Sequence, residues 1–399
     1  MRRFVISSDF RTISFITAMI FAIPGLWKGL QGIHLWLSPF LMLNSVFALK
    51  SFVWLNIIAV PVLILIIFKK RWFCKYLCPA GLCFDKMSSL SRRGNMEYNK
   101  LPDIGKWLAI ISLITALFGF PLFVILDPLA LFNGFFLNLA VKPDLMVIIS
   151  LFIFPLLLVI HFFLPGIWCK KLCPLGGLQT GLLDIKTHLS GLIPGRKQPA
   201  KAELPGRRYF LMSGAGLLAG LTVPMILRPS ADKVIRPPGT AVPHLFNLIC
   251  CRCGNCIKAC PTNIIIPFTD ISQPLSYLTP VISFGSGYCL ETCNICGKVC
   301  TTGAITLFSV EAKKDLVIGS AMVERQNCYL LNNRECIKCR EVCKYNAIVY
   351  KHGNDLAGTV PVVDPQKCVG CGACEVVCPA ECIIVKPIQP SVYREKHKV

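Results

Sequence analysis

Cysteine spacing constrains the fold of this chain more than any other feature of the sequence. Of the 399 residues, 23 are cysteine, and the run Cys-x2-Cys-x2-Cys-x3-Cys-Pro occurs twice with the same spacing. Three thiolates so close in sequence can wrap one corner of a [4Fe–4S] cluster, while the fourth, before a proline, serves the other cluster of a pair. Both runs are therefore predicted to bind clusters. The two regular groups are Cys250, Cys253, Cys256 and Cys260, and Cys368, Cys371, Cys374 and Cys378.

Two looser cysteine groups lie between the regular ones. One has a longer first gap and Thr301 in place of the proline, and the other is complete only if Cys328 supplies its first ligand. Each of the four groups is followed by a short apolar run that is typical of a strand. We therefore expect sixteen ligands for four [4Fe–4S] clusters. The looser groups are Cys289, Cys293, Cys296 and Cys300, and Cys328, Cys336, Cys339 and Cys343.

Zinc sites and disulfides are the other common uses of cysteine. Zinc is usually held by Cys-x2-Cys pairs that are separated by a dozen or more residues, and cysteines so close in sequence have poor disulfide geometry. The sequence contains no Cys-x-x-Cys-His motif for haem attachment. The spacing therefore favours iron–sulfur clusters. Cys251 and Cys382 fall outside the four groups, and we expect them to be small, buried, apolar side chains.

In a two-cluster ferredoxin, each cysteine group supplies its fourth thiolate to the cluster of the other group. The four groups are therefore expected to form two pairs, but the spacing does not decide which groups pair. In the first arrangement the two regular groups pair, so that Cys378 completes the first group and Cys260 completes the last. The two looser groups then pair as well, with Cys343 completing the second group and Cys300 the third. In the alternative arrangement the groups pair in sequence order, the first with the second.

Long apolar stretches dominate the first half of the chain. Hydrophobic residues make up 54% of the sequence and charged residues only 16%, a composition that is unusual for a soluble protein. Segments 69–106 and 165–208 hold nine and eight Lys or Arg residues, and such segments stay cytoplasmic. We therefore expect a bacterial inner-membrane protein with a cytoplasmic N-terminus and a periplasmic C-terminal domain. The five stretches predicted to cross the bilayer are residues 13–26, 53–68, 107–126, 145–164 and 209–227.

The apolar half contains an internal repeat. The motif Cys74-x3-Cys78-Pro79 recurs as Cys169-x3-Cys173-Pro174, and residues 39–44 have a counterpart in residues 128–133. Duplicated helix pairs of this kind pack about an approximate two-fold axis. The predicted fold is an all-α membrane bundle (four helices in two repeats plus a fifth anchor helix), followed by an α+β polyferredoxin domain of bacterial 2[4Fe–4S] ferredoxin-like modules. The expected domains are residues 1–205, 206–228 and 229–399, for the bundle, the anchor and the four-cluster domain.

The repeated Cys-x3-Cys-Pro motif leaves several roles open. If the repeats pack symmetrically, they bring together four thiols, enough for one further metal or cluster site. A thiol redox pair and a soft-metal site are alternatives, and so are buried thiols at helix ends without a ligand. The four thiols are Cys74, Cys78, Cys169 and Cys173.

The motifs resemble two known protein types joined in one chain. Residues 1 to 205, with their two Cys-x3-Cys-Pro motifs, resemble the NapH type of membrane quinol dehydrogenase subunit. Residues from 206 onward resemble the NapG/MauM type of exported ferredoxin with four clusters, and Arg207-Arg208 is similar to a twin-arginine export signal. Subunits of the NapH type carry two further clusters after the fourth helix. Residues 174–206 contain no cysteine, so that cytoplasmic relay is not expected here.

This resemblance implies an electron-transfer protein with quinol as its substrate. Electrons from the membrane quinone pool would pass singly through four [4Fe–4S] clusters to a periplasmic reductase or dehydrogenase, directly or through a cytochrome or another redox subunit. The alternatives are an electron-donating accessory factor for maturation of a periplasmic metalloenzyme, and a redox-sensing membrane regulator. Nucleic acid is not an expected partner, because +15 of the formal charge of +21 lies in residues 1–227 and the clusters add negative charge to the remainder.

Three ionisable residues of the apolar half are candidates for accepting quinol protons. His34 and Asp127 lie at the outer ends of the repeated units, where such residues are also common as interfacial side chains. His161 lies deep in the fourth apolar stretch, where an ionisable group either marks a functional pocket or is hydrogen-bonded between helices.

Overall fold

The structure, a computed structural model, describes most of the chain. The described residues are 2–23, 32–69, 71–91, 98, 101–140, 145–191, 207–226, 234–240, 246–270, 272–273, 275–332, 334–352 and 359–388. They form two compact units. The first unit is Met1–Arg228 with Asn247–Gly254 and Thr301–Gly303, and the second is Pro229–Phe246, Asn255–Cys300 and Ala304–Val399. The predicted boundary between residues 205 and 206 falls at the edge of segment 192–206, which lies outside the described residues.

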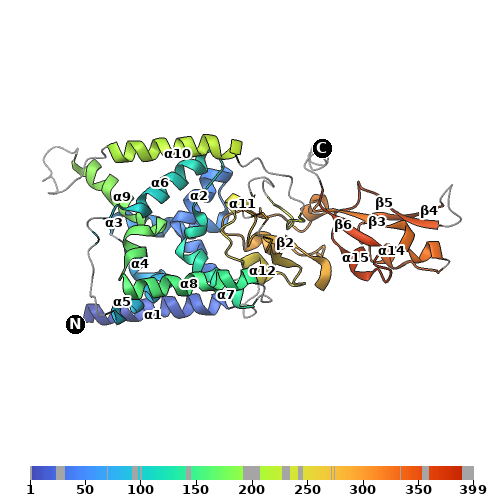
Figure 1. The fold of residues 1–399 in the computed structure, drawn as a ribbon, viewed down its shortest axis with the longest axis horizontal. Coiled ribbons are helices and arrows are strands. Elements are labelled where there is room, and N and C mark those ends of the chain that lie inside the picture. The colour runs from blue at the N-terminus through green and yellow to red at the C-terminus, as the bar shows by residue number, and fades with distance from the viewer. Residues whose placement is uncertain are drawn as a thin grey trace. The chain divides into compact units, whose positions relative to one another are not determined.

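The first unit is built of helices (Figure 1). Single-turn 3-10 helices at Ile33–Leu37, Trp54–Ile58 and Val124–Leu126 lead into three of them, and a short π-helix at Trp168–Leu172 leads into a fourth. The α-helices are α1 (Arg2–Ala22), α2 (Pro39–Leu49), α3 (Ala59–Phe68), α4 (Trp72–Tyr76), α5 (Pro79–Leu90), α6 (Ile104–Leu117), α7 (Pro128–Ala140), α8 (Leu145–Phe163), α9 (Pro174–Gly191) and α10 (Arg207–Ile226).

From residue 246 onward the elements are short. The described residues form three antiparallel sheets of two strands each, and such small sheets are marginally stable without further support. The strands pair as β1 (Ile265–Pro267) with β2 (Pro280–Ile282), β3 (Ser320–Val323) with β6 (Ile383–Lys386), and β4 (Ile348–His352) with β5 (Thr359–Val363). The short helices are α11 (Phe246–Ile249), α12 (Asn255–Ala259), α13 (Ile295–Lys298), α14 (Lys338–Glu341) and α15 (Ala373–Val377).

The structure contradicts the predicted membrane bundle. Among the described residues, no helix combines enough length with enough apolar character to cross a bilayer. A spanning helix needs about 20 apolar residues, whereas stretch 53–68 forms a 3-10 turn followed by the 10 residues of α3, and stretch 107–126 falls largely in the 14-residue α6. The prediction of an all-α membrane bundle with an anchor helix is therefore wrong. The inner-membrane location inferred from it is wrong for the same reason.

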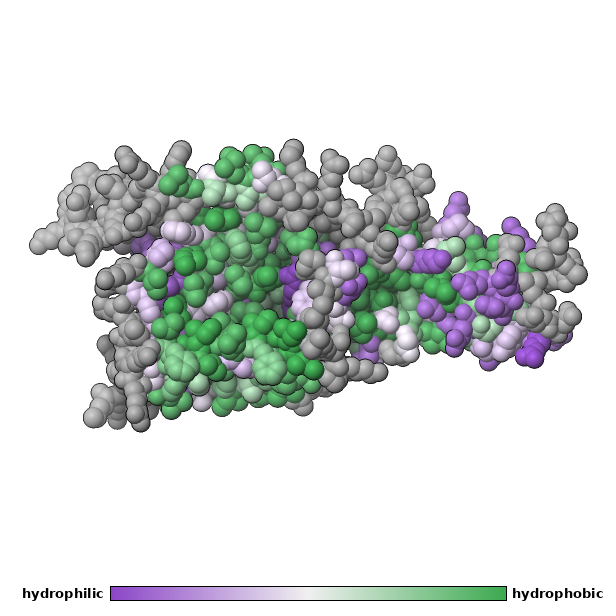
Figure 2. Space-filling model, in the orientation of Figure 1, coloured by the Kyte–Doolittle hydropathy of each residue, from purple (hydrophilic) through white to green (hydrophobic). Residues whose placement is uncertain are grey.

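Apolar side chains of the first unit are exposed as well as buried. Figure 2 shows hydrophobic residues gathered over its helices. On α8, Ile149, Phe152 and Leu156 are 52%, 63% and 58% exposed and recur at the spacing of one helix face, while Val147 and Phe154 are buried. The high hydropathy of this half thus reflects exposed surface together with core.

Four helices of the first unit begin with a capping side chain followed by proline. A proline at the first helical position has no N–H to leave unpaired, and the residue before it accepts a hydrogen bond from the first turn. The repeat supplies these residues in matched pairs, Ser38 with Asp127 and Cys78 with Cys173. Leu41 N donates to Ser38 Oγ (3.3 Å), Leu129 N to Asp127 Oδ1 (2.9 Å), Gly81 N to Cys78 Sγ (3.3 Å) and Gly176 N to Cys173 Sγ (3.4 Å).

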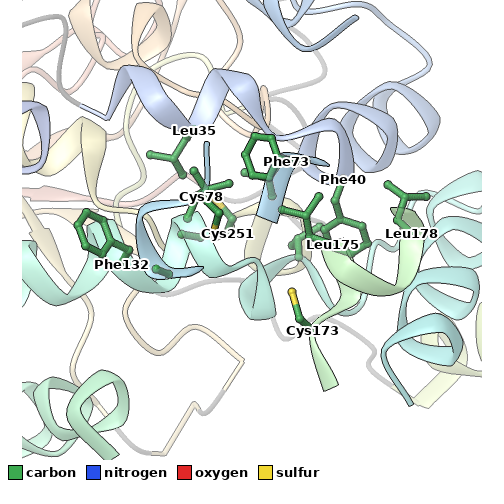
Figure 3. Packing of buried hydrophobic residues seen from close by; sticks show 14 of the residues in the cluster. Leu35, Phe40, Phe73, Cys78, Phe132, Cys173, Leu175, Leu178 and Cys251 are labelled. Carbon is green, nitrogen blue, oxygen red and sulfur yellow. The ribbon is translucent and has the colours of Figure 1, made fainter. Parts of the chain in front are cut away.

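The core of the first unit combines side chains from both repeats (Figure 3). Burial of one large apolar side chain stabilises a fold by roughly 1.5–3 kcal/mol, and many contribute here. The buried cluster includes Leu35, Phe40, Phe73, Phe132, Leu175 and Leu178 together with the sulfur-bearing Cys78, Cys173 and Cys251. Cys251 is 4% exposed, which confirms the expectation that it is a buried apolar side chain.

Two glycines allow α6 and α9 to cross in close contact. A Cβ atom at Gly177 would lie 2.1 Å from the carbonyl carbon of Gly105, and one at Gly105 would lie 2.5 Å from the carbonyl oxygen of Cys173. These obstacles are backbone atoms, which cannot move aside as a flexible side chain can. The crossing therefore fixes the position of Cys173 against α6.

We predict that Gly177→Ala destabilises the first unit by about 2 kcal/mol or more, because its methyl group overlaps the α6 backbone. Gly181→Ala on the same helix is the matched control. A Cβ there meets nothing within 4 Å, so alanine should stabilise α9 by about 0.5–1 kcal/mol. Thermal unfolding of the two variants measures the difference, and equal midpoints would contradict the close crossing.

Candidate iron–sulfur sites

The same tight turn follows the last cysteine of every group. Three residues after that cysteine the backbone is left-handed, with φ of 55° at Asn263, 67° at Gly303, 49° at Asn346 and 48° at Glu381. Asn and Gly adopt this conformation readily. The N–H groups of Asn263, Asn346 and Glu381 donate to the carbonyl of the last cysteine (3.2–3.3 Å). The turn starts the strand that follows three of the groups, β1, β4 and β6.

Three cavities of the second unit are each lined by one complete set of four cysteine thiols. Each set takes three cysteines from one group and one from a neighbouring group in the sequence. The three cavities are similar in size, about 360, 350 and 340 Å³ when the part open to solvent is included. The sets are Cys260 with Cys289, Cys293 and Cys296; Cys343 with Cys368, Cys371 and Cys374; and Cys378 with Cys328, Cys336 and Cys339.

This arrangement follows the sequential order of pairing. Cys260 joins the second group and Cys343 the fourth, whereas the pairing of the two regular groups would have sent Cys260 to the fourth group. Cys378 in turn joins the third group. The third and fourth groups thus exchange one cysteine each, as a two-cluster module requires.

The remaining four of the sixteen cysteines are divided between the two units, Cys250 and Cys253 in the first and Cys256 and Cys300 in the second. Within the first unit, Asn133 Nδ2 donates to the carbonyl of Cys253 (2.6 Å), and Cys253 packs against the core that contains Cys251. Ile305 N donates to Cys300 Sγ (3.3 Å). The four residues are Cys250, Cys253, Cys256 and Cys300.

The chemistry of the cavities suits an anionic cluster. Burial raises the pKa of Cys289, and the Lys313 ammonium opposes this increase. Lys313 is itself 5% exposed and donates to the carbonyls of Leu290 and Cys293. Negative charge on the four thiols would compensate this buried cation, since a paired buried charge costs less than an isolated one. Among the described residues, no three His, Cys, Asp or Glu side chains are placed to hold a single metal ion.

The four Cys-x3-Cys-Pro thiols are brought together in the first unit. Burial raises the pKa of Cys78, and the nearby Cys74, Cys169 and Cys173 raise it further. Each second thiol of the motif lies at a helix N-terminus, where the helix dipole favours negative charge. The repeat therefore assembles one four-thiol site from two half-sites.

Gln179 and Arg71 connect the two halves of this site. Gln179 of α9 donates to Cys74 Sγ (3.0 Å) and accepts a hydrogen bond from Phe73 N (3.3 Å). The Arg71 guanidinium donates to the Lys170 carbonyl (2.9 Å), and its charge lowers the pKa of Cys74 against the dominant effect of burial. Both side chains hold one repeat against the other at the thiols.

The proton-acceptor candidates occupy buried positions. Ser38 Oγ donates to Asp127 Oδ2 (2.7 Å), so that equivalent residues of the two repeats meet, and burial raises the pKa of Asp127 to about 6. The His34 ring packs edge-on against Phe132 at 6.0 Å. The His161 ring stacks on Phe84 at 4.2 Å, its Nδ1 lies 2.7 Å from the Leu157 carbonyl oxygen, and burial lowers its pKa.

Sequence reasoning missed Gln179 and Lys313. Neither forms part of a recognisable motif, and their places beside thiols depend on the packing of distant segments. Gln179 has one sequence signal, since it lies six residues after Cys173 whereas the first repeat has the apolar Phe84 six residues after Cys78. The sequence indicated this residue only through a polar side chain at a position where the other repeat has an apolar one.

Two known sequence families match the chain. The family described as a 4Fe-4S dicluster domain matches residues 332–382, which contain the fourth cysteine group and all of the third except Cys328. The family described as a 4Fe-4S binding domain matches residues 51–94 and 146–194, one segment in each repeat. No solved structure matches the chain.

The methylamine utilization ferredoxin-type protein MauM of Methylophilus methylotrophus is 32% identical over 180 residues, which are 43% of this chain and 79% of that protein. The chain belongs to the MauM/NapG family of ferredoxin-type proteins. The ferredoxin-type protein NapG of Escherichia coli K12 is 31% identical over 208 residues, 47% of this chain and 87% of that protein. The ferredoxin-type protein NapF of the same organism is 30% identical over 158 residues, 38% of this chain and 85% of that protein.

Membership of the MauM/NapG family confirms the ferredoxin part of the sequence prediction. The protein is an iron–sulfur electron-transfer protein of the ferredoxin type. The resemblance of residues 1–205 to the NapH type stays a prediction.

We predict that Cys260→Ala and Cys289→Ala remove the same cluster from this MauM/NapG-family ferredoxin, because both thiols line one cavity. The double variant should then lose no more iron than either single variant. Cys260→Ala combined with Cys368→Ala should lose two clusters, since those thiols line different cavities. Iron analysis with EPR of the reduced protein measures the counts. Additive loss in the first pair would support the pairing of the two regular groups.

We predict that the protein becomes less stable as the pH rises from about 4 to 6, in part because of Asp127. Its folded pKa is about 6, above the ordinary value of 3.8, so over this interval the unfolded carboxyl loses its proton first and unfolding becomes easier. The effect amounts to about 3 kcal/mol at most. Asp127→Asn, which can still cap α7, should lack this component. Denaturant unfolding of both proteins from pH 4 to 7 tests it, and a pH-independent difference would contradict the raised pKa.

Proposed function

We propose that the chain carries single electrons along four [4Fe–4S] clusters, from a two-electron donor of the quinol class to a partner oxidoreductase. The observation that carries this proposal is the set of three cavities, each lined by four thiols from two neighbouring groups. The regular spacing of the first cysteine group predicts the fourth cluster, whose full ligand set stays a prediction from the sequence. Membership of the MauM/NapG family supports the same class of function.

The electron count explains why several clusters are useful. Oxidation of one quinol to quinone releases two electrons and two protons, and each [4Fe–4S] cluster accepts one electron at a time. The protein residues hold the thiolates in place, shield them from solvent and supply positive charge. Lys313, buried beside the second cysteine group, is one such charge.

We propose that the Cys-x3-Cys-Pro site is the point of electron entry and holds one further [4Fe–4S] cluster. Its thiols Cys78 and Cys173 lie in the same buried core as Cys251, and Cys253 of the first ferredoxin group packs against that core. One ligand of the first group is therefore close to the thiol site within the first unit. The match of both repeats to a 4Fe-4S binding family supports iron and sulfide as the ligand.

Asp127 is the side chain that we propose as first proton acceptor. Burial raises the pKa of Cys173, and the charge of Asp127 adds to this increase, which supports a role for this carboxyl beside the thiol site. His34 and His161 stay alternative acceptors. The sequence resemblance implies a periplasmic reductase or dehydrogenase as the electron acceptor, and that partner class stays a prediction.

The proposed function is tested with protein purified without oxygen. A soluble quinol analogue should bleach the visible absorption of the clusters, and a chemical electron acceptor should restore it. Cys74→Ser should slow bleaching by the quinol by about tenfold or more, while dithionite still reduces the ferredoxin clusters. Cys83→Ala is the matched control and should behave as wild type, because Cys83 lies on α5 outside the Cys-x3-Cys-Pro motif. Clusters that dithionite reduces but quinol never does would overturn the quinol proposal.

A further inference from the structure

One cavity of the second unit contains a fifth cysteine. Cys382 lines the same cavity as Cys328, Cys336, Cys339 and Cys378. Its Sγ lies 3.5 Å from Cys378 Sγ, which is van der Waals contact between two sulfur atoms. The residues lining each of the other two cavities include four cysteines. The extra thiol is thus directed at one site only.

The turn after the fourth group explains how Cys382 reaches this cavity. Glu381 has the left-handed backbone described above, and its N–H donates to the Cys378 carbonyl (3.2 Å). This turn reverses the chain so that the residue after it lies beside Cys378. Glu324 N then donates to the Cys382 carbonyl (2.7 Å) and fixes the start of β6.

The equivalent positions of the other groups show that the fold does not need a thiol here. The residue after the turn is Ile264 in the first group, Ala304 in the second and Ala347 in the third, and each is buried to within 2% exposure. Cys382 is 2% exposed in the same way. Since alanine occupies this position in two groups, the sulfur of Cys382 is not required by packing.

Because the two sulfurs are in contact, they cannot both be thiolates at the same time. Two thiolates 3.5 Å apart in a buried cavity would repel strongly, so one sulfur can bind iron as a thiolate while the other stays a protonated thiol. The proton can pass from one sulfur to the other without leaving the cavity.

We propose that Cys378 and Cys382 form an interchangeable ligand pair for one iron of the cluster held by Cys328, Cys336 and Cys339. In the exchange, the Cys378–iron bond breaks and Cys378 takes a proton, while Cys382 gives up its proton and bonds the same iron. No electron is transferred and the total charge is unchanged. The proposal rests on the cluster-binding part of the proposed function and does not depend on the quinol.

Iron content and EPR of three variants test this exchange. Cys378→Ala should keep the wild-type number of clusters, because Cys382 replaces the lost ligand. Cys382→Ala should also keep that number and should fold, since alanine stands at the equivalent positions. The double variant should lose one cluster. The matched control is Cys343→Ala, whose cavity is lined by no fifth cysteine among the described residues, and it should lose one cluster as a single substitution.

Two results would overturn the proposal. If Cys378→Ala loses one cluster, as Cys343→Ala does, Cys382 is not a reserve ligand. If the double variant keeps every cluster, neither sulfur is a ligand and the proposal also fails. The EPR signals of the remaining clusters report whether each variant is folded. Failure of the quinol to reduce the clusters would leave these iron counts unchanged, so the two proposals are tested separately.

Discussion

The second unit depends on the exchange of cysteine thiols between neighbouring segments. Each of three cavities receives three thiols from one short run and a fourth from another run. The sheets beside them have only two strands each, too few to be stable alone. Closing a loop through a metal centre removes conformational entropy from the unfolded chain, so cluster binding is expected to stabilise these short elements.

The same N-terminal capping arrangement recurs at four helices of the first unit and serves two purposes. A capping residue before proline starts four helices. In one matched pair the caps are oxygen-bearing side chains that hydrogen-bond to one another across the repeat, Ser38 to Asp127. In the other pair the caps are the thiols of Cys78 and Cys173. Duplication therefore places a polar contact and a four-thiol site at equivalent helix starts.

The sequence was sufficient to predict iron–sulfur binding, the strands that follow three of the cysteine groups and the burial of Cys251, because all of these follow from local spacing. It could not decide the pairing, since Cys260 and Cys378 have the same local context and differ only in which segment folds beside them. The membrane prediction failed because hydropathy was averaged over stretches such as 53–68, which the chain divides into separate short helices. Gln179 and Lys313 were missed because no pattern marks a residue whose partner is distant in sequence.

The exchange of thiols also sets an order for biosynthesis. The cavity completed by Cys378 takes its other thiols from Cys328, Cys336 and Cys339, some forty residues earlier. When the ribosome has made the third group, three thiols of this site are present without the fourth. They stay accessible to oxygen and to other metals until the fourth group emerges. A complete cluster can therefore be bound here only after both the third and the fourth cysteine groups have been translated. A chaperone or assembly protein could protect the thiols of the third group during that interval.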